Sequence, residues 1–376
     1  MTGRSEVPFL DLSPQTAEVR DEIWAGWSAV VEGSHFIGGE RVARFEDEWA
    51  SYCGTGHAIG VANGTDALHL ALRALDVGYG HDVVVPANTF VATAEAVVLA
   101  GATPRFADVD HDTLLITAQT LKAAVTPATK AVIVVHLFGQ MANMDEIQAV
   151  AAELGIEVLE DAAQAQGARW RGSPAGSLGR VGCFSFYPGK NLGAFGDAGA
   201  IVTQDADLAT RLRSLRDHGR EAGGHYDHVA VGTNSRLDSL QAVVLSAKLK
   251  RLDSWNDARR SLMSRYHEML DPDRVRLVST LPQAEPVHHL AVAQVERRDA
   301  VRDQLALRGI ATGIHYPTPC HLTRPYAGYQ DSPLPVVEAA ARRIVSLPLY
   351  PHMAAADVDR VCETLNQVTS PGEYST

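Results

Sequence analysis

The stretch SFYPGKNLGAFGDAG, from Ser185 to Gly199, begins as a strand and then places one proline and four glycines around a single lysine, Lys190. Glycine and proline are poor at stabilising a helix or a sheet, so this composition predicts a loop that follows a strand. Such a loop usually has a ligand to approach, and Lys190 is then the residue that meets it. A solvated surface lysine explains the loop equally well, and the loop alone does not decide.

Strand-like and helical patterns alternate through the first two thirds of the chain, which indicates an α/β domain with a largely parallel sheet. The expected strands are Val83–Val85, Ala131–Val135, Glu157–Leu159, Gly182–Phe186 and Ala200–Thr203. Expected helices include Thr65–Leu75, where leucines recur at helical spacing, and Met144–Leu154, which stops at Gly155 as helices often do.

From Leu237 the pattern changes to a long, charged helical segment that runs toward Tyr266 and stops before Pro272. We expect one long helix here, leading out of the first domain. The elements expected after it are a strand over His289–Val295, a helix over Asp299–Leu307, a strand over Ile310–Tyr316 and a helix over Ala356–Val368. We therefore predict a large domain over residues 1–250 and a small C-terminal α+β domain over residues 251–376.

The composition is that of a globular protein with a sizeable core, since 46% of the 376 residues are hydrophobic. The formal net charge of −12 gives no basic field, so neither nucleic acid nor an anionic membrane is an expected partner. The four cysteines are far apart and form no CxxC pair, so neither a metal site nor a disulfide framework is indicated. Without a signal-peptide pattern or a membrane-length apolar run, we expect a soluble, cytoplasmic protein.

A second polar cluster, EDAAQAQGA over residues 160–168, comes directly after the expected strand Glu157–Leu159. Ligands of open α/β sheets bind beyond the carboxyl ends of the strands, where Asp161 falls. A carboxylate there can pair with a protonated pyridine nitrogen and keep the ring an effective electron sink. Gln164 is within reach of a ring oxygen. A cap or surface ion pair for Asp161 and an ordinary polar role for Gln164 are the alternatives.

A third feature is the turn Asn-Gly-Thr that precedes an amphipathic helix in ANGTDALHLALRAL, residues 62–75. Free backbone N–H groups at Gly64 and Thr65 and the positive end of the helix dipole converge there, which predicts a phosphate site. Ser185 can add a hydroxyl from the neighbouring strand end. Ordinary turn and cap chemistry explains the motif equally well. Phe90, just after a strand in PANTF, can stack on a flat heterocycle, although a lone phenylalanine is more often a core residue.

These clusters, in this order, closely resemble the DegT/StrS family of sugar aminotransferases, within the aspartate aminotransferase fold group. The resemblance covers nearly the whole chain, through PFLDL, FIGGERVARFEDEWASYCG, NGTDALHLAL, PANTF, FADVD, HLFGQ, EDAAQAQGA, SFYPGKNLGAFGDAG, NSRLDSLQAVVL and HYPTPCHL. One such motif is weak evidence, but ten in the family's order make coincidence improbable.

The resemblance implies a fold type I transferase with a mostly parallel seven-stranded sheet, a homodimer, pyridoxal 5'-phosphate (PLP) as cofactor and L-glutamate as amino donor. It makes Lys190 the lysine that holds PLP as a Schiff base. Asp161 becomes the partner of the ring nitrogen, Gln164 the contact to the phenolic oxygen and Phe90 the stacking aromatic. The implied phosphate contacts are Gly64, Thr65, Ser185 and, reaching across the dimer interface, Asn234.

Two positions depart from the family pattern, because many relatives read EDAAQAHG and YPTKN where this chain has Gln166 and Gly189. Gln166 removes an imidazole near the site, which leaves the details of the substrate open. Dehydratases of the family carry His in place of the lysine, so the retained Lys190 favours an aminotransferase. Lys190 would also serve as the base that moves the α-proton. Because the cofactor would first take the amino group from glutamate and then pass it to the keto-sugar, we expect ping-pong kinetics.

The resemblance also indicates a nucleotide-linked keto-sugar as substrate. The NGTDAL form of the phosphate loop is similar to relatives that act at C3 of dTDP- or UDP-linked 3-keto sugars, among enzymes of deoxyamino-sugar biosynthesis for antibiotics. We expect a dTDP-3-keto-6-deoxyhexose, with Arg220, His315 and Tyr316 as candidate contacts. The alternatives are an aminotransferase acting at C4 or on a cyclitol ketone, a sugar dehydratase, and a catalytically silent regulator.

Overall fold

The computed structural model describes residues 6–221, 223–224, 226–330 and 332–370. Its centre is a seven-stranded sheet with strand order β1-β9-β8-β5-β4-β2-β3. The strands are β1 (His57–Val61), β2 (Asp82–Pro86), β3 (Thr103–Ala107), β4 (Thr129–Val135), β5 (Glu157–Asp161), β8 (Val181–Ser185) and β9 (Gly199–Thr203). Neighbours from β8 to β3 are parallel, whereas β9 is antiparallel to β1 and β8. The predicted sheet is confirmed.

Helices pack around this sheet, and strands β2 and β9 are buried along their whole length, as in sheets covered on both faces. The helices of this region are α2 (Glu40–Cys53), α3 (Gly64–Ala74), α4 (Val91–Leu99), α5 (Ala118–Ala124), α6 (Met144–Leu154) and α7 (Ala206–Leu215), with a 3-10 turn η1 (Leu137–Gly139). The sequence did not predict the edge strands β1 and β3. Pro104 obscures β3, and a sheet tolerates proline at its edge because one side of that strand needs no N–H donor.

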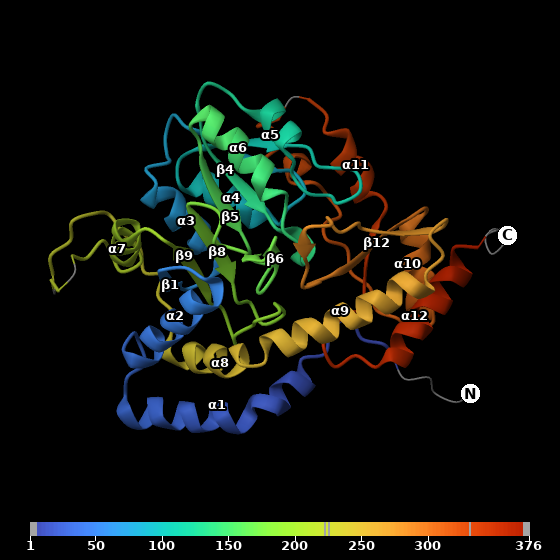
Figure 1. The fold of residues 1–376 in the computed structure, drawn as a ribbon, viewed down its shortest axis with the longest axis horizontal. Coiled ribbons are helices and arrows are strands. Elements are labelled where there is room, and N and C mark those ends of the chain that lie inside the picture. The colour runs from blue at the N-terminus through green and yellow to red at the C-terminus, as the bar shows by residue number, and fades with distance from the viewer. Residues whose placement is uncertain (1–5, 222, 225, 331, 371–376) are drawn as a thin grey trace.

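The long helix expected from Leu237 is wrong in one respect, because the structure breaks it into α8 (Ser239–Leu249) and α9 (Leu252–Met269). Helix α8 packs along α1 (Ser13–Gly33), and their apolar side chains meet in a small core of their own. Helix α9 leaves that core and reaches the C-terminal elements (Figure 1). The break at Lys250 and Arg251 lets the two helices serve different cores, and both residues pair with Glu22 of α1.

The C-terminal part is built on a three-stranded antiparallel sheet of β10 (Val275–Leu277), β12 (Ala291–Val295) and β13 (Ile344–Leu347). Helices α9, α10 (Arg298–Leu307) and α12 (Ala355–Val368) complete its core. The remaining elements are β6 (Arg169–Trp170), β7 (Ser173–Pro174), β11 (Ala284–Glu285), η2 (Cys320–Leu322) and α11 (Pro335–Ala341). The predicted strand over Ile310–Tyr316 is wrong. That segment makes only single bridges, to Val7 and Ser346, and β13 takes its place in the sheet.

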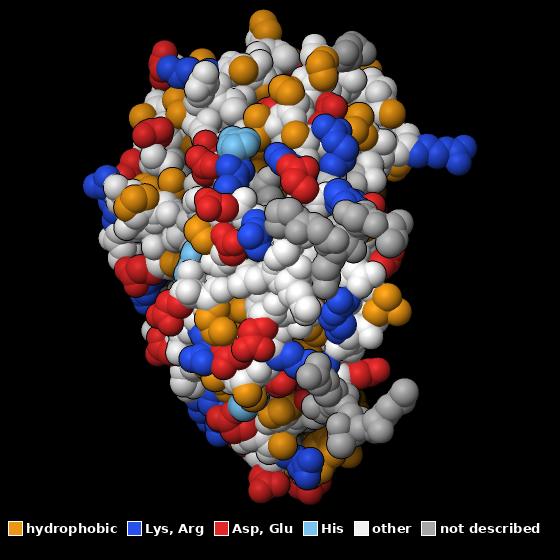
Figure 2. Space-filling view, turned by 90° about the vertical axis from the view of Figure 1, so that its right-hand side faces the viewer, with side chains coloured by type: hydrophobic (Ala, Val, Ile, Leu, Met, Phe, Trp, Pro, Cys, Tyr) orange, Lys and Arg blue, Asp and Glu red, His pale blue; other side chains and the backbone are white. Residues whose placement is uncertain are grey.

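The core around the seven-stranded sheet and the core around the three-stranded sheet interleave along the chain. The core of the three-stranded sheet includes Val7 from the N-terminal segment and starts in α9 at Leu262, whereas Val278 and Val287 pack in the core of the seven-stranded sheet. The domain boundary at residue 250 therefore stays a prediction. Figure 2 shows acidic and basic side chains interspersed over the face that it presents. Within the described ranges, no helix combines the length and apolar character needed to cross a bilayer.

Candidate active site

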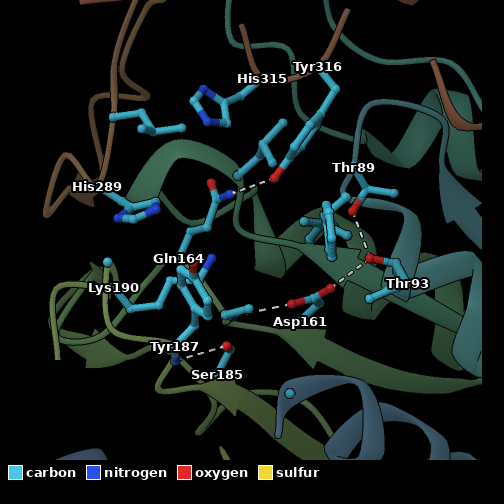
Figure 3. A pocket seen from close by; sticks show the side chains of 18 of the residues that line it. Thr89, Thr93, Asp161, Gln164, Ser185, Tyr187, Lys190, His289, His315 and Tyr316 are labelled. Carbon is cyan, nitrogen blue, oxygen red and sulfur yellow. Dashed lines mark hydrogen bonds between the residues drawn. The ribbon is translucent and has the colours of Figure 1, made fainter. Parts of the chain in front are cut away.

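A cavity of about 590 Å³ opens where β4, β5 and β8 end, and Val135, Asp161 and Ser185, the last residues of these strands, line it. Figure 3 shows Lys190 and His289 on one side of it and Asp161 and Thr93 on the other. The sequence-predicted residues that line this cavity are Gly64, Thr65, Phe90, Asp161, Gln164, Ser185, Lys190, His315 and Tyr316. Arg220 and Asn234 are not among its lining residues.

Lys190 reaches the cavity from the loop between β8 and β9. The turn is closed by a 2.8 Å bond from the Lys190 N–H to the Tyr187 carbonyl, and Gly193 is required because a Cβ there would lie 2.4 Å from the Pro188 oxygen. Burial lowers the pKa of the Lys190 amine to about 8, and the Asp161 carboxylate opposes that shift. About a tenth of the molecules then carry a neutral amine at pH 7, available as nucleophile or base.

Asn191, the neighbour of Lys190, ties this loop to α9 and to the chain before β12. Its Nδ2 donates to Asn256 Oδ1 at 2.9 Å and to the Val287 carbonyl at 3.0 Å. Its Oδ1 is then left to accept from Nδ1 of His289 at 3.1 Å, which sets the tautomer of that ring. Burial and then the charge of Lys190 hold the pKa of His289 well below its usual range, so His289 is a neutral imidazole beside Lys190.

Helix α8 holds the other half of the same loop. The buried Lys248 donates to the Gly193 carbonyl at 2.7 Å, and its ammonium lies 4.6 Å from the centre of the Phe195 ring. Gln241 accepts from the Phe195 N–H at 2.9 Å. Neither side chain was predicted from the sequence, although a lysine on the apolar face of α8 could have indicated Lys248.

Asp161 is the last residue of β5 and is 6% exposed. Its Oδ2 accepts from the Thr93 hydroxyl at 2.8 Å and its Oδ1 from the Ala163 N–H at 3.2 Å (Figure 3). Burial raises the pKa of the Asp161 carboxyl, while these two donors and the charge of Lys190 pull it down. Asp161 lies at a strand end as predicted, whereas its partner Thr93 was not predicted from the sequence.

Glu160, one residue earlier, points to the opposite face of β5 and is fully buried. It accepts hydrogen bonds from the backbone N–H groups of Gly176, Leu178 and Gly179. The Nδ1 of His136 accepts from the Ala142 N–H, so its Nε2 is the donor to Glu160 at 2.8 Å. With every donor assigned, this pair braces the strand that carries Asp161.

Gln164 is fixed in orientation by its neighbours. Its Oε1 accepts from the Phe138 N–H at 2.7 Å, and one of its amide protons goes to the Tyr316 hydroxyl at 3.3 Å. Phe138 has a φ of 62°, a left-handed conformation that costs a bulky L-residue about 1–2 kcal/mol. This strained backbone aims the N–H at Gln164, and the second amide proton of Gln164 stays available to an acceptor in the cavity.

The expected phosphate site has the geometry of a helix N-terminus. The Asn63 side chain caps α3 by accepting from the Asp66 N–H at 2.8 Å, so the earlier N–H groups of Gly64 and Thr65 stay unpaired. Gly64 has no room for a side chain, because its Cβ would lie 2.7 Å from the Ser185 Cβ. Backbone donors and a serine hydroxyl therefore meet at one end of the cavity.

Aromatic side chains form one wall of the cavity. Phe90 is 54% exposed, which excludes the core alternative, and its ring centre lies 5.6 Å from that of Tyr316. His315 bonds Ser346 through Nδ1 at 2.8 Å and stacks against Phe9 from the N-terminal segment. Burial, and then the charge of Lys190, lower the pKa of His315 to about 4, so the ring is neutral at pH 7.

Arg220 and Asn234 lie instead on the loop after α7, described over residues 217–221, 223–224 and 226–234, which projects from the body (Figure 1). Arg220 pairs with Asp217 at 3.3 Å, and its buried Nε has no partner within the described part of the chain. Asn234 is exposed and forms a bridge with Asp217. Within one chain, the structure does not bring these two predicted residues together with the others.

The chain matches the model of the DegT/DnrJ/EryC1/StrS aminotransferase family over residues 18–366. It is 44% identical to the dTDP-3-amino-3,4,6-trideoxy-alpha-D-glucose transaminase of Streptomyces venezuelae, over 98% of each chain. It is also 44% identical to the UDP-N-acetyl-3-dehydro-alpha-D-glucosamine 3-aminotransferase of Acidithiobacillus ferrooxidans, over 98% of this chain and 99% of the other. Among solved structures, S. venezuelae DesV in complex with a ketimine intermediate superimposes with a TM-score of 0.94 at 43% identity, covering 98% of this chain and 99% of that one.

Proposed function

This chain belongs to the DegT/DnrJ/EryC1/StrS aminotransferase family, and on that basis we propose that it transfers the amino group of L-glutamate to a nucleotide-linked keto-sugar. The acceptor we propose is a dTDP-3-keto-6-deoxyhexose, aminated at C3 in deoxyamino-sugar biosynthesis. The observation that carries this proposal is that the amine of Lys190 and the carboxylate of Asp161 line the same cavity, in a chain 44% identical to a C3-amino-sugar transaminase.

Aminotransferases of this family use PLP, and the lining of the cavity fits that cofactor. The unpaired N–H groups in the first turn of α3 and the hydroxyl of Ser185 would hold the phosphate. Asp161 would face the ring nitrogen, and the spare amide proton of Gln164 would meet the phenolic oxygen. Phe90 would lie against the ring. Lys190 would make the covalent attachment, for which a lowered pKa suits its amine.

When bound, PLP supplies a carbonyl carbon that accepts an amino group and a ring that takes up the electrons left by a departing proton. The residues of the chain do the rest. As a free amine, Lys190 would take the proton from Cα of the amino donor through its Nζ. The Asp161 carboxylate would accept a hydrogen bond from the ring N–H and favour the protonated ring nitrogen. Burial lowers the pKa of His289 and of His315, so both imidazoles are weaker bases than the Lys190 amine and would not compete with it for that proton.

The proposal includes a homodimer in which Asn234 and the sugar-nucleotide contact Arg220 act on the partner's cavity. Three features support it: neither residue lines its own cavity, the loop that carries them projects outward, and Val229 and Val231 on this loop are 66% and 83% exposed. Apolar side chains on a projecting loop are typical of a surface that another chain covers. We also propose the reducing cytoplasm as the compartment, because all four cysteines are buried free thiols.

The regiochemistry is tested best by running the reaction backward. Purified enzyme with PLP is given 2-oxoglutarate and either a dTDP-3-amino or a dTDP-4-amino-6-deoxyhexose, and glutamate formation is followed. Displacement of the reacting carbon by about 1 Å can cost on the order of a hundredfold in rate, so we expect the 3-amino compound to react far faster. Faster turnover of the 4-amino compound would overturn the C3 assignment alone. Absence of glutamate with both sugars and with a UDP-linked 3-amino sugar would overturn the proposed substrate class.

A further inference from the structure

Two threonines at the start of α4 form a hydrogen-bonded chain that ends on Asp161. The Thr89 and Thr93 hydroxyl oxygens lie 2.7 Å apart, and Thr93 is 2.8 Å from Asp161 Oδ2 (Figure 3). Both side chains are buried, at 4% and 1% exposure, and both line the cavity. Phe90 lies between them in sequence and turns its ring into the cavity. One helix start therefore carries both the stacking ring and the contact to the carboxylate.

The direction of the protons in this chain depends on the charge of Asp161. An ionised carboxylate only accepts, so Thr93 must point its single proton at Oδ2. The oxygen of Thr93 is then free to accept the proton of Thr89, and the two bonds polarise each other. A neutral carboxyl could also accept from Thr93, but hydrogen bonds to an ionised acceptor are roughly twice as strong as those between neutral groups. The donated hydrogen bond from Thr93 therefore favours the ionised state of Asp161.

Asp161 needs such support because burial works against its charge. Burial is the largest influence on the pKa of this carboxyl and raises it, whereas the hydrogen bond from Thr93 is the largest influence that lowers it. The other titratable groups that interact with Asp161 are Lys190, His136, Tyr316 and Cys183. Of these, Lys190 is the group that the cofactor would engage. The hydrogen bonds from the Thr93 hydroxyl and the Ala163 N–H would remain when PLP is bound, and Thr93 is the side chain of the two that substitution can remove.

We propose that Thr93, oriented by Thr89, is a positioning residue that keeps the Asp161 carboxylate ionised and fixed opposite the ring nitrogen of PLP. This rests on the proposed function, in which Asp161 is the partner of that nitrogen. It adds that the hydroxyl, rather than the shape of the threonine side chain, is what the cofactor site requires. Serine should therefore replace Thr93, and the isosteric valine should not.

The test measures the dissociation constant of PLP by equilibrium dialysis between pH 5 and pH 8, in wild type, Thr93→Val and Thr93→Ser. Loss of a hydrogen bond to a charged group should shift the acid titration of Asp161 upward by about one to two pH units. The ratio of variant to wild-type dissociation constants should then grow as the pH falls, to about tenfold or more. The same variant should lose kcat with little change in KM for glutamate. Thr93→Ser should follow the wild type.

Thr203→Val is the matched control, since Thr203 is also buried and donates to a carbonyl, but it lies on β9 and does not line the cavity. Melting temperatures establish that each variant is folded. If Thr93→Val does not fold, Thr89→Val carries the test, with a smaller shift of the same sign expected because it acts through Thr93. A pH-independent ratio, an equal shift in Thr203→Val, or an equal loss in Thr93→Ser would each overturn the inference. A wild type that neither binds PLP nor transaminates would overturn the proposed function instead.

Discussion

The sequence predicted functional residues at two places: Asp161 and Gln164 at one end of the cavity, called the ring end below, and Arg220 and Asn234 on the loop after α7. The two places differ in how they are built. At the ring end, Asp161 and Gln164 are buried, and each is held by donors or acceptors from other segments of the same chain. On the loop, Asn234 is exposed, and Arg220 pairs with Asp217 of the same loop at 3.3 Å. One chain brings Asp161 and Gln164 together in its cavity, whereas Arg220 and Asn234 do not line the cavity of their own chain.

This contrast separates two kinds of requirement. Chemistry at the ring needs charges fixed in a site that excludes water, and only a packed interior provides that. Recognition of a phosphate or a nucleotide can be supplied by side chains that join the site on assembly. Substitutions at the two places should therefore fail in different ways.

The largest expected effect is at the ring end. Lys190→Ala should abolish transamination while the protein stays folded, because the side chain projects into a cavity and its loss opens no core. Borohydride treatment followed by peptide mapping should attach PLP to Lys190 in the wild type and to no residue in the variant. Reductive attachment at a different lysine would show that the covalent role is misassigned.

Asp161→Asn should bind PLP but slow the reaction on the order of a hundredfold or more, because an amide cannot favour the protonated ring nitrogen. The measurement is single-turnover conversion with glutamate, compared with the wild type at the same PLP occupancy. The amide has nearly the same volume, so melting temperature serves as the control for packing. Near wild-type rates would remove Asp161 as the ring partner.

Mixing tests whether the loop acts across the interface. Lys190→Ala and Asn234→Ala subunits, each inactive alone, should recover about one quarter of wild-type activity after random exchange, since half of the dimers then contain one intact site out of two. Subunit exchange is verified with a size-tagged chain. If exchange occurs and activity stays absent, Asn234 serves its own chain or has no role in the reaction.

The smallest effect concerns pH. An amine with a pKa of about 8 gains the neutral form as the pH rises and is almost fully neutral above pH 9. Capture of PLP by the cofactor-free protein should therefore speed up about tenfold between pH 7 and pH 9 and then level off, whereas an ordinary lysine would gain about a hundredfold and keep rising. Stopped-flow absorbance measures this. Continued acceleration beyond pH 9 would contradict the lowered pKa.

Local sequence determined much of this protein. A strand followed by clustered glycines predicts a loop, because glycines stabilise neither a helix nor a sheet, and this pattern located Lys190. Asp161 and Ser185 were located by strand ends, because side chains at the carboxyl end of a parallel sheet face the same crevice. The alternation of strands and helices gave the α/β class, and the family motifs gave the number of strands and the cofactor.

Contacts between distant segments were decided only by the tertiary structure. The break between α8 and α9 depends on two separate cores, which hydrophobic periodicity along one helix does not reveal. The loss of the expected strand at Ile310–Tyr316 depends on competition from β13, which begins 28 positions after Tyr316. Thr93, Lys248 and His289 meet the site through hydrogen bonds to residues 55 to 98 positions distant. A sequence lists donors and acceptors, but the pairing that satisfies buried polar groups exists only once the chain is folded.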